Sequence, residues 1–116
     1  MKKKIYIAGK VTGEKIAECT MKFGDAQKQI EALGFEVVNP LTLVNDWKAP
    51  WNKAMKKCIT AVMHCDGVLL LGDWMRSKGA KLEVEICDHL GIKTFNNIND
   101  LKEWNNSQPT TPKAKK

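Results

Sequence analysis

The sequence predicts a single doubly wound α/β domain, with a parallel sheet of four to five strands and helices on both faces. Apolar segments of strand length alternate with amphipathic segments of helix length along most of the chain. One of these segments, Gly67–Leu71, is apolar throughout, as expected for a central parallel strand that is buried on both faces. The length of 116 residues and the hydrophobic content of 43% suit one small core.

The N-terminal part of the chain is expected to form a strand, a helix and a second strand. The first strand is Lys4–Ala8. In Glu14–Leu33 apolar side chains recur every three or four residues, which predicts a helix, and Gly34 ends it. The second strand is Glu36–Asn39, and Pro40 stops it.

The remaining elements follow the same alternation. A loop over 41–50 leads to a helix over 51–64, and the strand Gly67–Leu71 comes next. The helix that contains Glu83 ends at Gly91, and Lys93–Phe95 forms a short fourth strand. A last helical turn is expected over 99–105. The domain is therefore placed at residues 1–106, with a disordered basic tail at 107–116, and the arrangement is Rossmann- or flavodoxin-like.

The predicted ligand site lies at the carboxyl ends of these strands, where open α/β sheets bind their ligands. Those ends carry two glycine-bearing turns, at residues 9–13 and 72–79, and the step from Asn39 to Pro40. Lys10 and the free backbone amides at both helix starts favour an anion such as phosphate. The predicted binding residues are Gly9, Lys10, Thr12, Gly13, Asn39, Asp73, Trp74, Ser77 and Gly79.

Glu83 is a candidate ligand-facing side chain, because helical geometry places it on the apolar side of its helix. At about 100° per residue, it falls between the directions of Cys87 and Leu90, whereas Lys81 and Asp88 share the opposite side. A carboxylate that faces a core needs partners, a raised pKa or an opening to solvent. Two interpretations stay open: a Glu at the edge of the apolar stripe that reaches water, or a carboxylate that lines a pocket.

The net charge of +6 does not indicate a nucleic-acid partner, because the excess lysines lie at residues 2–4 and 113–116 and the body between them is close to neutral. No segment approaches the roughly 20 apolar residues of a membrane span, and no apolar run follows the N-terminal lysines as in a signal peptide. A cytoplasmic protein without a membrane partner is therefore expected.

The cysteines show no Cys-x-x-Cys pair and no metal-ligand spacing with a histidine. Three of them fall on the apolar stripes of predicted helices. We interpret them as reduced, buried thiols, and we expect no metal and no organic cofactor. The four residues are Cys19, Cys58, Cys65 and Cys87.

Three segments of the chain resemble the nucleoside 2-deoxyribosyltransferase superfamily, which includes the deoxynucleoside 5′-monophosphate N-glycosidases. The resemblance runs from about Lys4 to Thr94 and is strongest to a branch of small bacterial and phage proteins. Its most specific part is the Ser-x-Gly-x-x-x-Glu element between a strand and a helix. The segments are Ile5-Tyr6-Ile7-Ala8-Gly9, Cys65-Asp66-Gly67-Val68 and Ser77-Lys78-Gly79-Ala80-Lys81-Leu82-Glu83.

The resemblance implies roles for individual residues. Glu83 matches the glutamate nucleophile that attacks C1′ of the sugar, and Tyr6 matches a tyrosine that orients that glutamate. Asp66 matches an aspartate that helps protonate or hold the leaving base, although as the residue before a strand it could instead orient a turn. Ser77 matches a serine that contacts the 5′-phosphate in the glycosidases.

Residues 9–13 match the phosphate-binding loop of this superfamily but depart from its sequence pattern. Lys10 and Thr12 stand where the glycosidases have Ser and Arg, so a point charge replaces a bidentate phosphate contact. The tryptophans near the predicted site, Trp47, Trp51 and Trp74, fit either core and interface positions or surfaces on which a base stacks.

The resemblance implies an enzyme that cleaves or transfers the N-glycosidic bond of a nucleoside or nucleoside 5′-monophosphate. It also implies a homodimer or higher homo-oligomer, for which exposed Trp and Met side chains over 47–63 suit an interface. The alternative is a non-catalytic nucleotide-binding or regulatory module on the same scaffold, in which Glu83 pairs with Lys10.

Overall fold

The computed structural model describes residues 2–107 and confirms the predicted parallel α/β architecture. Its four strands are all parallel and lie in the order β2-β1-β3-β4. Tyr6, in the middle of β1, lies opposite Val38 of β2 and Val68 of β3. The central position of β1 therefore places Tyr6 inside the domain. The strands are β1 (Lys4–Ala8), β2 (Glu36–Val38), β3 (Gly67–Leu70) and β4 (Lys93–Phe95).

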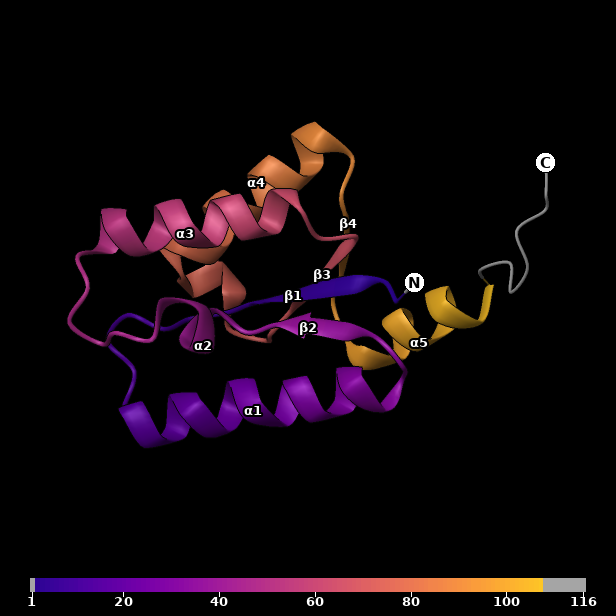
Figure 1. Cartoon of the computed structure of the whole chain (residues 1–116), viewed down its shortest axis with the longest axis horizontal. Helices are drawn as coiled ribbons and strands as arrows, with labels where there is room; N and C mark the ends of the chain where they lie inside the picture. The colour runs from indigo at the N-terminus through magenta and orange to yellow at the C-terminus, as the bar shows by residue number, and fades with distance from the viewer. Residues whose placement is uncertain (1, 108–116) are drawn as a thin grey trace.

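Helices cover both faces of the sheet, as Figure 1 shows. Helix α1 (Ile16–Ala32) and helix α5 (Ile98–Ser107) lie against one face, and helices α3 (Trp51–Met63) and α4 (Lys78–Leu90) lie against the other. This second face carries the candidate site.

The sheet separates two hydrophobic cores, because successive side chains of a strand point to opposite faces. Ile5 and Ile7 of β1 join the core under α1 and α5. Tyr6 and Ala8 join the core under α3 and α4. The alternation thus directs the Tyr6 ring toward α4, the helix that contains Glu83.

The predicted loop over 41–50 is partly wrong, because it contains helix α2 (Pro40–Val44). The Asn39 side chain accepts a hydrogen bond from Leu41 N at 3.0 Å, and Pro40 occupies the first turn. Asn at the N-cap and Pro at the first position are favourable start signals for a helix. Pro40 therefore begins a helix as well as ending β2. A 3₁₀ turn, η1 (Trp74–Arg76), likewise lies within the predicted turn after β3.

The other element boundaries agree with prediction to within a few residues, with one consequence for the domain limit. Helix α5 continues to Ser107, so this residue belongs to the folded part and not to the predicted tail. The rest of that tail, residues 108–116, lies outside the described residues.

All four cysteines are buried and free, as the sequence predicts. Across residues 2–107, no helix has the length and apolar content needed to cross a membrane.

Replacement of Gly9 by Ala should lower the free energy of unfolding by about 1–3 kcal/mol through overpacking. A Cβ atom at Gly9 would lie 2.7 Å from Leu71 Cδ1 and 3.0 Å from Leu71 Cβ. Gly24→Ala, within α1, is the matched control, because a Cβ atom there meets nothing within 4 Å. That control should instead gain about 0.5–1 kcal/mol from helix propensity. Urea unfolding measures both, and equal effects of the two substitutions would contradict the packing argument.

Candidate functional site

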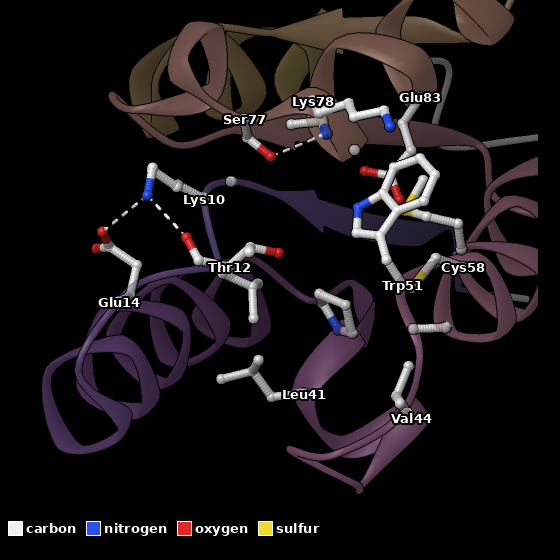
Figure 2. A pocket seen from close by; sticks show the side chains of 18 of the residues that line it. Lys10, Thr12, Glu14, Leu41, Val44, Trp51, Cys58, Ser77, Lys78 and Glu83 are labelled. Carbon is white, nitrogen blue, oxygen red and sulfur yellow. Dashed lines mark hydrogen bonds and ion pairs between the residues drawn. The ribbon is translucent and has the colours of Figure 1, made fainter.

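A cavity of about 890 Å³ opens where the chain leaves the carboxyl ends of β1, β2 and β3. Its wall is formed by four segments: the loop 9–14 after β1, residues 40–49 (α2 and the loop that follows it), the first turns of α3, and residues 76–83. Figure 2 shows side chains from these segments directed into one space. The volume lies within the range of about 300–1,000 Å³ that is typical of ligand pockets.

Glu83 lies deep in this cavity and is hydrogen-bonded to Tyr6. The Tyr6 hydroxyl donates to Glu83 Oε2 at 2.7 Å. The two residues are only 4% and 1% exposed, respectively. Of the two interpretations of Glu83, the pocket-lining carboxylate is therefore correct.

The burial of Glu83 changes its acid–base behaviour. Removal from water raises the pKa of the carboxyl group to about 7, although the hydrogen bond from Tyr6 acts in the opposite direction. Burial, followed by the negative charge of Glu83, raises the pKa of Tyr6 well above its ordinary value, so the phenol keeps its proton. At neutral pH, Glu83 is thus divided between its acid and its carboxylate, with Tyr6 as a fixed donor.

The loop after β1 is held by a network of charges in which Lys22 of α1 is central. Lys22 Nζ donates to Asp73 Oδ2 at 2.5 Å, to the Lys10 carbonyl at 2.9 Å and to Glu14 Oε1 at 3.2 Å. Asp73 Oδ1 also accepts from Lys10 N at 3.0 Å. The network joins the loop after β1 to the turn after β3, and so fixes one wall of the cavity.

The Lys10 side chain is part of this network and does not contact Glu83. Its ammonium group donates to the Thr12 carbonyl at 2.7 Å and lies 3.4 Å from Glu14 Oε2, as drawn in Figure 2. The Lys10–Glu83 pair expected for a non-catalytic module is therefore replaced by a Lys10–Glu14 pair. Glu14 compensates the charge that Lys10 would offer to an anion.

The opposite wall is formed by the start of α4 and by Trp51 of α3. The Ser77 hydroxyl oxygen caps α4 by accepting from Ala80 N at 3.1 Å. Lys78 Nζ lies 4.3 Å from the centre of the Trp51 ring, a cation–π contact across the two helices. A Cβ atom at Gly79 would approach Met55 Sδ to 2.9 Å, so the glycine permits close packing of α4 on α3.

The structure places most of the predicted site residues in the cavity wall, but not all of them. Asn39 caps α2 and also donates to Gln27 Oε1 at 3.1 Å. Asp73 acts through the Lys22 network, and Trp74 packs against the core under α3 and α4. The predicted residues that do line the cavity are Tyr6, Gly9, Lys10, Thr12, Gly13, Ser77, Gly79 and Glu83.

Asp66 lies outside the cavity, at the amino end of the sheet. Its side chain accepts from Lys4 N at 2.8 Å, and its own amide donates to the Lys4 carbonyl at 2.8 Å. Because β3 is parallel to β1, the residue before β3 lies at the edge opposite to the ligand-binding edge. Asp66 is thus in the turn-orienting position that its place before the strand allowed.

Several cavity residues were missed by sequence reasoning. The loop after α2 contributes Asp46, η1 contributes Arg76, and α3 contributes Cys58. Cys58 carried a partial signal, since it lies on the apolar stripe of α3. Lys22, which anchors the cavity wall without lining the cavity, carried no signal, because its partner Asp73 is distant along the chain. In the region 2–107, no three His, Cys, Asp or Glu side chains gather in a group that could hold a metal.

Residues 3–96 match the family model described as Domain of unknown function (DUF4406), so the chain belongs to this family. The match covers β1 through β4 and therefore every segment that lines the cavity. No curated protein matches the chain.

Lys22→Met should lower the free energy of unfolding by roughly 1–3 kcal/mol, because it removes charged hydrogen bonds to a largely buried carboxylate. Although burial alone would raise the pKa of Asp73, the hydrogen bonds from Lys22 and Lys10 lower it from its ordinary value. This stabilisation is present above the ordinary pKa of Asp73 and is lost as pH falls through the lowered value. Urea unfolding between pH 2 and pH 7 measures it, with Lys28→Met on the exposed side of α1 as control. Equal losses in both variants would contradict a specific role for Lys22.

Glu83→Gln should stabilise the protein above pH 7, by up to roughly 3 kcal/mol. The pKa of Glu83 is raised from 4.5 to about 7 in the folded state, so folding takes up a proton between these values. The stability of the wild type therefore falls as pH rises through this window, and the amide variant lacks that decline. Denaturation at pH 4.5, 6 and 8 tests this, with Glu85→Gln on the exposed side of α4 as the matched control. A decline of the same size in Glu83→Gln would show that another group causes it.

Proposed function

We propose that this member of the DUF4406 family cleaves or transfers the N-glycosidic bond of a nucleoside or nucleotide, with Glu83 as the nucleophile. The observation that carries the proposal is the Tyr6–Glu83 hydrogen bond of 2.7 Å within a cavity of about 890 Å³. A carboxylate that is buried, oriented and open to a cavity is a recurrent feature of catalytic sites.

The burial of Glu83 suits attack on a sugar carbon. Cleavage of an N-glycosidic bond develops positive charge at C1′, which an adjacent carboxylate stabilises or traps. A poorly hydrated carboxylate interacts more strongly with that charge than a hydrated one does. The hydrogen bond from Tyr6 orients the group through Oε2, and in the proposal Oε1 is the oxygen that attacks C1′.

The proposed reaction has two steps. A Glu83 carboxylate oxygen forms a bond to C1′ while the bond from C1′ to the base nitrogen breaks. The electron pair of the broken bond leaves with the base, which takes up a proton. Water or a second base then attacks C1′ and releases Glu83.

The location of Asp66 changes one part of the mechanism that the resemblance implies. A residue at the opposite edge of the sheet does not reach a base in this cavity, so Asp66 is not the proton donor in the proposal. The leaving base takes its proton from water at the mouth of the cavity instead.

Incubation with a panel of deoxynucleosides and their 5′-monophosphates, followed by chromatography for free base, should show release by the wild type. Glu83→Gln should lower the rate by roughly a thousandfold or more, as expected for loss of a nucleophile. The rate of the wild type should rise with pH through about 7, because burial raises the pKa of Glu83 to that value and only its ionised form attacks. Saturable binding of a nucleotide without any release of base would overturn the proposal and support a non-catalytic module.

A further inference from the structure

The loop after β1 already holds an anion of its own, the carboxylate of Glu14. Glu14 Oε2 lies 3.4 Å from Lys10 Nζ, and Glu14 Oε1 accepts a hydrogen bond from Lys22 Nζ at 3.2 Å. Two ammonium groups thus contact different oxygens of one carboxylate. A phosphate group bound to this loop would need the same two cations. Figure 2 shows the Lys10–Glu14 pair on the wall of the cavity that the loop 9–14 forms.

The backbone of the loop places Glu14 in this position. Glu14 N donates to the Val11 carbonyl at 3.1 Å, which closes a tight turn, and Gly13 within that turn has a φ of 82°. A positive φ of this size favours glycine. Lys10 Nζ donates to the Thr12 carbonyl of the same turn at 2.7 Å. The ion pair is therefore built into the loop, and is not an isolated contact between two surface side chains.

The charges along the rest of the cavity wall are balanced. With Glu83 in its ionised, attacking form, the lining contains three cations and three carboxylates, so their sum is zero. The hydrogen bond from Lys22 lowers the pKa of Glu14 below its ordinary value, so Glu14 is ionised at neutral pH. Behind the loop, the pair of Lys22 and Asp73 adds no net charge. The ionisable lining residues counted here are Lys10, Arg76 and Lys78, and Glu14, Asp46 and Glu83.

A 5′-phosphate would therefore enter a cavity without surplus positive charge. Such a group carries about −1.5 to −2 charges at neutral pH, and its removal from water is costly unless cations or several donors compensate it. Binding at the loop would also bring it next to the Glu14 carboxylate, where like charges repel. A neutral 5′-hydroxyl group has neither cost.

We propose that Glu14 is a specificity-determining residue, which occupies the position of an anion on the loop after β1 so that the cavity selects a nucleoside over its 5′-monophosphate. The inference rests on the proposed function for the kind of ligand, and it narrows the two ligand classes of that proposal to one. It also reverses the expectation, drawn from Lys10 and the loop sequence, that the site favours phosphate. Selection arises from a charge that opposes the wrong ligand.

The experiment compares each deoxynucleoside with its own 5′-monophosphate, through the ratio of the two kcat/KM values for release of base. In the wild type this ratio should favour the nucleoside. Glu14→Gln keeps the size of the side chain and removes its charge, so the charge of Lys10 is no longer compensated. The ratio should then shift toward the monophosphate by roughly tenfold, as expected for the loss of one nearby, partly exposed charge.

Two further variants separate position from net charge. Glu18→Gln is the matched control, because Glu18 lies exposed in the first turn of α1 and its replacement changes the net charge equally. Its ratio should equal that of the wild type. Adding Lys10→Met to Glu14→Gln should return the ratio toward the wild-type value, because the newly available cation is then absent. The gain in Glu14→Gln should also shrink at high salt, which screens the charge of Lys10.

A wild type that prefers the monophosphates would overturn the inference without any substitution. An unchanged ratio in Glu14→Gln would do the same, as would an equal change in Glu18→Gln. If neither form releases base, the proposed function fails, and calorimetric binding of the same pairs then decides the role of Glu14. Tighter binding of the nucleosides, with a gain for the monophosphates in Glu14→Gln, would support it. Tighter binding of the monophosphates by the wild type, or binding of neither form, would contradict it.

Discussion

The 2.7 Å hydrogen bond between Tyr6 and Glu83 is the interaction on which the organisation of this site depends. It joins the strand at the centre of the sheet to the second turn of α4, residues that are 77 positions apart in the chain. It exists only because β1 lies beside β3 and because Tyr6, not Ile5 or Ile7, faces the α3 and α4 side. The topology of the sheet therefore creates the environment of the carboxylate.

The Tyr6 hydrogen bond compensates only part of the free-energy cost of burying Glu83. A single phenol donor offsets part of the cost of removing Glu83 from water, and the pKa of the carboxyl group stays at about 7. A purely structural position would favour Gln or an apolar residue, which fill the same space without that cost. A destabilising side chain at the floor of a cavity is a pattern found where activity and stability are in conflict.

Much of the fold could be predicted because its signals are local. The apolar run Gly67–Leu71 predicted the central strand, and Gly91 predicted the end of α4, where it adopts a φ of 72°. Helix α2 was missed although its signal was present, because Pro40 was interpreted only as the end of a strand. The inward direction of Glu83 also followed from local geometry, since the helical period alone places it among apolar neighbours.

The features of the site that the sequence could not predict depend on contacts between distant segments. Lys22 meets Asp73 across 51 residues, and no spacing along α1 predicts such a pairing. Asp66 was assigned a role by resemblance, whereas the parallel direction of β3 places it at the opposite edge from the cavity. The position of Lys10 was predicted correctly. Its ion pair with Glu14, which compensates the charge, was not predicted, because that pair depends on the conformation of the loop.

The two layers of helices also divide the tryptophans into separate optical reporters. Trp104 of α5 stacks on Phe35, with ring centres 6.0 Å apart, on the face of the sheet that is remote from the cavity. Trp47 and Trp51 belong to the cavity wall. Emission from Trp104 therefore reports on the integrity of the core remote from the cavity, whereas emission from Trp47 or Trp51 reports on what enters the cavity. Fluorescence of single-tryptophan variants can separate ligand occupancy from unfolding in the same molecule, without an added label.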